Sequence, residues 1–193
     1  MNLKSYELNT AEERAAAVMA KMIDEGKKKN NILRYAHAVT DATTIHVIDF
    51  YKFIAFTLDG VNCGYICYTK KTTPDCSVRI IHAYVMRQFR KKGIGSEMVS
   101  YVTSRNSDVT LAIESKELKR FYFRLGFTYW IKSKGRIADE HKILGIKKDD
   151  ALSGATSKQA MSKPYYHVDL DAHAAFFAEQ ARLLIDTAER FIR

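Results

Sequence analysis

The sequence predicts an α/β (α+β) domain, a mixed and mostly antiparallel sheet flanked by helices, with an extra C-terminal helix. Three observations lead to this fold class: a β-patterned hairpin, the order strand, helix, strand, helix, strand after it, and an alanine-rich final stretch. This order after an antiparallel hairpin is typical of a mixed sheet covered by helices. The 193 residues, 47% of them hydrophobic, suffice for one domain with its own core.

The first predicted element is a helix that begins with a capping box. Thr10 is the expected N-cap and Glu13 reaches back to it. The apolar spacing continues to Ile23, and the helix is expected to end near Gly26. Residues 32–48 fit a helix and a strand equally well.

The β pattern starts at Phe50. Residues 50–58 and 63–68 predict two strands, and Asp59-Gly60 between them is a hairpin turn signal. Residues 69–75 form a polar loop before a third strand, Val78–Met86.

The pattern then changes to helical. A helix that starts near Gly93 would bury four apolar positions on one face, and a second amphipathic helix covers 116–125, closed by Gly126. Short strands are expected over 109–113 and 127–131.

The chain divides into three parts by composition. Residues 1–148 are expected to form the main domain, 149–166 a small, polar linker, and 167–193 one long helix that packs either on the domain or on a partner subunit of a homodimer.

Cysteine content and charge narrow the class of protein. Three cysteines suit no disulfide framework, and Cys63 and Cys67 are expected to be buried as small apolar residues. No metal-ligand pattern is present. No apolar run reaches the ~20 residues of a membrane span, and the N-terminus lacks a signal-peptide core, so a cytoplasmic protein is expected. The net charge of +9 suits a phosphorylated ligand or nucleic acid.

The segment Arg90-Lys91-Lys92-Gly93-Ile94-Gly95 follows a strand and opens a helix. Its glycines allow a bulky anion to approach the backbone, and the helix start directs N–H groups and a positive dipole toward that anion. A Walker P-loop or a dinucleotide fingerprint would need residues that are absent. Alone, the segment indicates either an anion site or a tight basic turn.

A second signature, Phe121 to Phe127, follows one helix and one strand later. Together the two segments resemble the acetyl-CoA motif [QR]-x-x-G-x-[GA] and the F-Y-x-x-x-G-F motif of the GNAT N-acetyltransferase superfamily. The resemblance covers about residues 49–131. It implies acetyl-CoA as co-substrate and no metal.

The resemblance also implies a set of cofactor-binding residues. The main chain at Tyr84 and Val85 would pair with pantetheine, and a backbone N–H there would polarise the thioester carbonyl. Ser115 takes the position of a pantetheine-binding asparagine. The pyrophosphate would lie on Arg90, Lys91, Lys92, Gly93, Ile94, Gly95 and Ser96. Lys91 replaces a glycine that is usual in the family, and Arg87 replaces a common proline.

Three residues are candidates for proton transfer. By the resemblance, Tyr122 would protonate the leaving CoA thiolate, although a tyrosine between two phenylalanines also fits a core position. Glu114, after a buried strand, and His82, in the cofactor strand, are candidate bases. A carboxylate at a helix start and a hydrogen-bonded core histidine are the structural alternatives.

The predicted function is therefore N-acetyl transfer from acetyl-CoA to a primary amine, on a protein lysine, an N-terminus or a small molecule, by direct attack. One alternative acceptor is an amine on nucleic acid, such as aminoacyl-tRNA or a modified base. Another possibility is a catalytically idle GNAT-like module that binds and regulates a partner protein.

Overall fold

The structure is a computed structural model, and it describes residues 2–26, 51–71, 73–113, 115–132 and 152–163. The chain divides into two units. The first unit comprises Met1–Tyr65, Tyr84–Arg90 and Tyr166–Arg193, and the second comprises Ile66–Ala83 and Lys91–Tyr165. Strands β3 (Val61–Thr69) and β4 (Val78–Val85) contribute residues to both units.

The first unit contains the N-terminal strand, helix and hairpin. Strand β1 (Leu3–Glu7) pairs antiparallel with β2 (Tyr51–Leu58), from Leu3↔Leu58 to Glu7↔Ile54. The β2–β3 turn lies where it is predicted, because Asp59 and Gly60 both have positive φ, 51° and 86°. The sequence did not predict β1, whose pattern is mostly exposed and polar.

Helix α1 (Ala11–Gly26) confirms the predicted capping box. The Glu13 N–H donates to the Thr10 hydroxyl at 3.2 Å, and the Glu13 carboxylate accepts from the N–H of Thr10 at 3.1 Å. The carboxylate also accepts from the N–H of Asn9 at 2.8 Å, and the two backbone bonds that it accepts, from Thr10 and Asn9, lower the pKa of Glu13. Local sequence alone therefore determines where this helix begins.

The second unit alternates helices and strands after β4. Strand β5 (Val109–Ile113) pairs parallel with β4, and β7 (Leu152–Ala155) pairs antiparallel with both β5 and β6 (Tyr129–Lys132). The helices of this unit in the described residues are α3 (Ile94–Thr103), α4 (Glu117–Phe123) and α6 (Lys158–Ser162).

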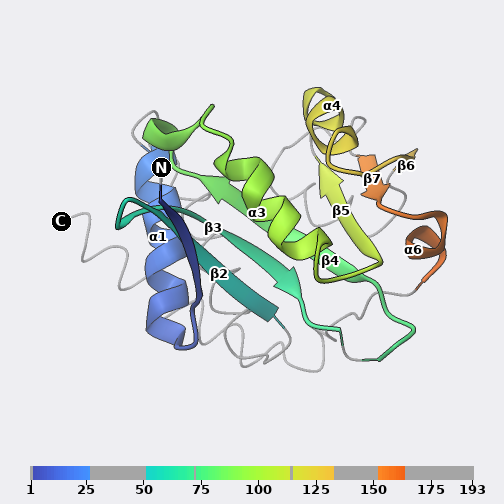
Figure 1. The fold of residues 1–193 in the computed structure, drawn as a ribbon, viewed down its shortest axis with the longest axis horizontal. Coiled ribbons are helices and arrows are strands. Elements are labelled where there is room, and N and C mark those ends of the chain that lie inside the picture. Colours follow the sequence, from blue (N-terminus) through green and yellow to red (C-terminus); the bar gives the residue numbers. More distant parts are fainter. Residues whose placement is uncertain (1, 27–50, 72, 114, 133–151, 164–193) are drawn as a thin grey trace. The chain divides into compact units, whose positions relative to one another are not determined.

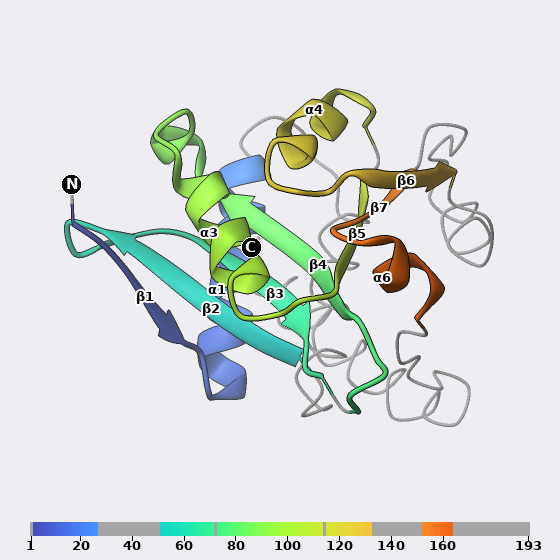
Figure 2. The ribbon, with the colours of Figure 1, turned by 45° about the vertical axis from the view of Figure 1, so that its right-hand side comes forward.

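The strands hydrogen-bond in the order β1-β2-β3-β4-β5-β7-β6, which confirms the predicted mixed and mostly antiparallel sheet with helices. Both views draw α3 alongside β4 (Figures 1 and 2). The apolar face predicted for α3 is buried, at Ile94, Met98, Val99 and Val102. Cys63 and Cys67 are also buried as expected, and burial raises the pKa of Cys63.

The expected linker is wrong over residues 152–162, which form β7 and α6. Strand β7 is small and polar, so its sequence carries no strand signal. Close packing explains its composition: a Cβ added at Gly154 would lie 2.7 Å from the ring of Trp130 on β6. The Trp130 Nε1 also donates to the Phe127 carbonyl at 2.6 Å.

Two sequence predictions fall outside the described residues: the ambiguous segment 32–48 and the C-terminal helix 167–193. Within the described residues, no helix has the length and hydropathy needed to cross a membrane.

Candidate functional site

The pairing between β4 and β5 is short. It runs from Val78↔Val109 to Ile80↔Leu111, although β4 continues to Val85 and β5 to Ile113. The C-terminal half of β5 pairs with β7 on its other side. The two parallel strands therefore pair only at their starts. On the side of β4 that faces β5, the pairing ends at Ile80, before the predicted binding residues Tyr84 and Val85.

In the first unit, the structure brings Tyr84, Val85 and Arg90 together. The Arg90 Nε donates to the Val85 carbonyl at 3.0 Å, and the guanidinium carbon lies 5.6 Å from the centre of the Tyr84 ring. The Met86 N–H donates to the Cys63 carbonyl at 2.9 Å, so β3 holds the end of β4. Tyr84 is buried.

Asp24, a residue that no sequence pattern indicates, also contacts this part of the first unit. The Oδ2 atom of Asp24, on α1, accepts hydrogen bonds from the Tyr84 hydroxyl and from the Arg87 N–H, the latter at 2.9 Å. Partial burial acts to raise the pKa of Asp24, but these bonds and the charges of Arg87 and Arg90 outweigh it, so the pKa is lowered. No local signal identifies Asp24, because its partners follow it by about 60 residues.

In the second unit, the predicted anion segment forms the start of α3. Lys91 has a φ of 64° and Gly93, the N-cap, a φ of 80°. The position where the family usually has glycine therefore has a left-handed backbone in this chain, at a steric cost for lysine. Near Gly93, no described atom lies within 4 Å of the place a Cβ would take.

The start of α3 leaves backbone donors open. Gly93 makes no side-chain cap, and its carbonyl accepts from the N–H groups of Ser96 and Glu97. Among the described residues, the N–H groups of Ile94 and Gly95 have no hydrogen-bond partner. Exposed Lys91 and Lys92 directly precede them. Unpaired N–H groups, a helix dipole and two cations together favour an anion.

Ser115 lies beside α4 and makes local contacts. Its hydroxyl donates to the Glu117 carboxylate at 2.6 Å and accepts from the Glu117 N–H at 3.3 Å. The side chain therefore already stabilises the first turn of this helix.

Tyr122 lies on α4 between two phenylalanines. Its ring makes edge-to-face contacts with Phe121 at 4.9 Å and with Phe127 at 5.7 Å between ring centroids. Burial raises the pKa of its hydroxyl, which stays protonated at neutral pH. Within the described residues the hydroxyl makes no hydrogen bond. Helix α4 ends at Phe123, two residues before the predicted end, and Gly126 beyond it has the positive φ expected of it, 92°.

The structure describes one of the two candidate bases, His82. His82 lies on β4 and is partly exposed. Glu114 lies outside the described residues, so its role as a base stays a prediction. Within the described part of the chain, no group of three His, Cys, Asp or Glu side chains could hold a metal ion.

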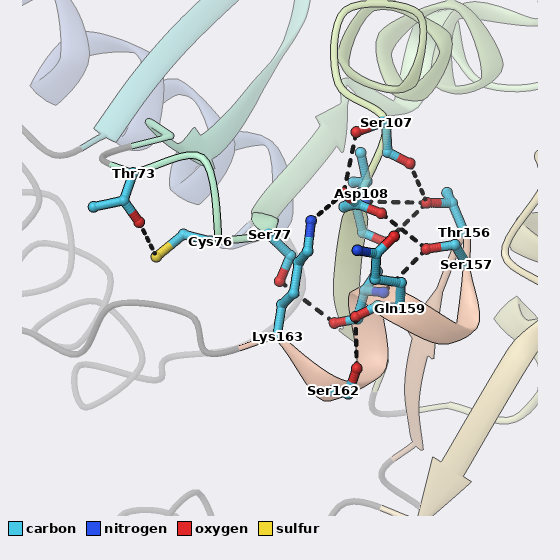
Figure 3. Close-up of polar contacts among 12 residues, drawn as sticks. Thr73, Cys76, Ser77, Ser107, Asp108, Thr156, Ser157, Gln159, Ser162 and Lys163 are labelled. Carbon is cyan, nitrogen blue, oxygen red and sulfur yellow. Dashed lines mark hydrogen bonds and ion pairs between the residues drawn. The ribbon is translucent and has the colours of Figure 1, made fainter.

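A separate polar cluster closes the start of α6 (Figure 3). Buried Asp108 accepts from the Lys163 ammonium at 2.7 Å and from the hydroxyls of Ser157 and Ser107 at 2.9 and 3.1 Å. These contacts, that of Lys163 above all, lower the pKa of Asp108 despite its burial. Ser157 is also the N-cap of α6, since its hydroxyl accepts from the Ala160 N–H at 3.0 Å.

Comparisons with known proteins agree with this geometry. Residues 49–129 match the family described as acetyltransferase (GNAT) domain, which confirms the resemblance seen in the two motifs. No curated protein matches the sequence significantly.

Several solved structures share the fold at low identity. The PaiA N-acetyltransferase of Thermoplasma acidophilum, in complex with coenzyme A, is 11% identical with a TM-score of 0.56, over 79% of this chain and 98% of that one. Escherichia coli ElaA is 13% identical with a TM-score of 0.57, over 81% and 100%. An aminoglycoside 6′-N-acetyltransferase complexed with coenzyme A is 11% identical with a TM-score of 0.53, over 80% and 96%.

Proposed function

We propose that this protein, whose residues 49–129 match the GNAT acetyltransferase domain family, transfers an acetyl group from acetyl-CoA to a primary amine by direct attack. The observation that carries the proposal is the open start of α3, where the Ile94 and Gly95 N–H groups have no partner among the described residues. CoA contains a pyrophosphate, the kind of anion that such a helix start binds.

The proposed binding of the CoA pyrophosphate at the start of α3 assigns roles to the neighbouring residues. The backbone N–H groups of Ile94 and Gly95 and the hydroxyl of Ser96 hold the pyrophosphate, and Lys91 and Lys92 add positive charge. The main chain at Tyr84 and Val85 pairs with the pantetheine amides as an added strand would. The short β4–β5 ladder supports this role, because it ends well before Val85. Acetyl-CoA supplies an activated acetyl group when bound.

The reaction needs two proton transfers. The amine nitrogen forms a bond with the thioester carbonyl carbon and loses a proton, and the bond from that carbon to sulfur breaks. Tyr122 donates its phenolic proton to the departing thiolate; the raised pKa keeps that proton in place until then. Glu114 or His82 accepts the proton from the amine, directly or through water.

The decisive experiment compares wild type with Tyr122→Phe. We expect the wild type to release CoA thiol when given acetyl-CoA and a suitable acceptor, and the variant to lose about 100-fold in kcat, the lower end for loss of a general acid. The Kd for CoA should stay the same. Tyr129→Phe, at an exposed tyrosine on β6, is the matched control and should leave kcat unchanged.

The acceptors tested should cover each class: protein extract, small amines and aminoacyl-tRNA, with mass spectrometry of the acetylated product. A protein that binds acetyl-CoA but acetylates none of these would be the regulatory module, and the proposed enzyme activity would be wrong.

A further inference from the structure

Asp24 occupies a position that its own helix does not favour. It lies in the last turn of α1, where the helix dipole favours cations, and this turn contains no basic residue. A carboxylate at this end therefore costs helix stability unless contacts from outside the helix offset it. Those contacts come from Tyr84 and Arg87.

The bond from Arg87 completes a helix start that lacks a cap of its own. The short 3-10 helix η1 (Arg87–Phe89) has Met86 as N-cap, which makes no side-chain hydrogen bond. Asp24 accepts from the N–H of Arg87 at 2.9 Å and so provides the cap from α1. Helix η1 leads directly to Arg90 at the start of the anion segment.

The bond from Tyr84 fixes the strand that precedes η1. The Tyr84 ring is buried, and Lys21 and Arg90 lie over it at 5.7 and 5.6 Å from the ring centre. The Asp24 carboxylate is also close enough to the charges of Arg87 and Arg90 that both lower its pKa, and it reduces the repulsion between these two cations. Asp24 thus contacts the chain on both sides of Val85, at Tyr84 and at Arg87. The Val85 carbonyl itself accepts a hydrogen bond from the Arg90 Nε at 3.0 Å.

We infer that Asp24 is a positioning residue for CoA binding: its carboxylate fixes the backbone from Tyr84 to Arg87 in the conformation that pairs with pantetheine and leads into the pyrophosphate segment. This inference rests on the proposed function. It assigns α1 a part in binding the cofactor, although Asp24 need not touch it.

The test is equilibrium binding of CoA by calorimetry, at a temperature where every variant is folded. Asp24→Ala should weaken binding about tenfold, the scale of a lost hydrogen bond to a charged group. Asp24→Asn keeps an oxygen acceptor without the charge and should weaken it about threefold, because neutral bonds are roughly half as strong. In turnover assays the KM for acetyl-CoA should rise while kcat changes by less than about twofold.

The matched control is Asp59→Asn. Asp59 is an exposed carboxylate in the same unit that accepts one backbone N–H, from Asn2 at 2.9 Å, and asparagine suits its positive φ. Its Kd for CoA should equal that of wild type. Amide hydrogen exchange of residues 84–90 without ligand should be faster in Asp24→Ala than in wild type or Asp59→Asn.

The outcomes separate the two proposals. A wild type that fails to bind CoA would overturn the proposed function, and the role of Asp24 with it. A wild type that binds CoA, with Asp24→Ala binding equally well, would overturn the role of Asp24 alone. Faster exchange without weaker binding would do the same, because Asp24 would then only stabilise the fold.

Discussion

Two helix starts in the second unit are built in opposite ways. Helix α6 begins at Ser157, whose hydroxyl accepts from the Ala160 N–H and donates to buried Asp108. Helix α3 begins at Gly93, which provides no side-chain cap and leaves two N–H groups without a partner among the described residues. The first start is closed by the protein, and the second is available to a ligand.

This difference separates stability from binding. The α6 start uses the partly buried ion pair between Lys163 and Asp108 and the hydroxyls of Ser157 and Ser107, all of which act within the fold. The α3 start accepts a left-handed lysine and an uncapped helix, features that cost stability and that an anion can compensate. Substitutions at the start of α6 should therefore change the stability of the fold, and substitutions at the start of α3 should mainly change the binding of the anion.

The largest expected effect comes from closing the α3 start with a carboxylate. Gly93→Asp should weaken CoA binding about a thousandfold, because a like charge ~4 Å from the pyrophosphate costs roughly 4 kcal/mol near a protein surface. Gly93→Asn has the same shape without the charge and also tolerates positive φ. Calorimetry should show a much smaller loss of CoA affinity for Gly93→Asn than for Gly93→Asp. Equal losses would mean that the size of the side chain, and not its charge, weakens binding.

The next effect comes from removing the charge at the other helix. Asp108→Ala leaves the Lys163 ammonium without its partner and should lower the free energy of unfolding by about 3 kcal/mol, as for other buried pairs. Urea unfolding measures this. The Kd for CoA should not change, and a variant that lost both stability and CoA binding would contradict the separation.

The Asp108 cluster should also make stability depend on pH. Because the pKa of Asp108 is lower in the folded protein than its unfolded value of about 3.9, its contribution is complete above pH 3.9 and declines as the pH falls through the folded pKa. Wild type should thus lose more stability than Asp108→Asn between pH 5 and 3. The free energy of unfolding is measured with urea at each pH. If it fell equally for the two proteins over this range, the contacts of Asp108 in Figure 3 would not contribute to stability.

A smaller effect is expected from the cap itself. Ser157→Ala removes the acceptor for the Ala160 N–H and should lower the free energy of unfolding by about 1 kcal/mol, typical for an N-cap. Ser162→Ala, at an exposed position near the end of α6, is the control. Thermal unfolding should show a smaller decrease in Tm for this variant than for Ser157→Ala.

The smallest effect concerns Lys91. Glycine relieves the left-handed strain and alanine does not, so Lys91→Gly should be more stable than Lys91→Ala by about 1 kcal/mol. Both variants lose the same charge and should weaken CoA binding equally. A difference in Kd between them would show that backbone conformation, rather than charge, matters at this position.

The sequence predicted the elements whose signals are local. The Thr10 capping box, the Asp59-Gly60 turn and the apolar face of α3 each depend on neighbouring residues, and all three are present. Strands β1 and β7 were missed because pairing with other strands determines them; β7 has only four residues, and one is a glycine under Trp130.

The candidate site divides in the same way. The segment Arg90 to Gly95 could be proposed as an anion site from the sequence because its glycines and cations are contiguous in the chain. Asp24 could not, because nothing near it in the sequence indicates that it would meet Tyr84 and Arg87. Contacts between distant segments are set by packing, and a single sequence does not display them.

The close packing of Trp130 on Gly154 has a spectroscopic consequence. Trp130 is the single tryptophan of the chain, its indole N–H is bound to the Phe127 carbonyl, and the Lys119 ammonium lies 5.7 Å from its ring. Emission from an indole responds to its hydrogen bond, to nearby charge and to water. Tryptophan emission, excited at a wavelength where the 11 tyrosines absorb little, therefore reports on one place, the β6–β7 pair, and follows changes there without a label.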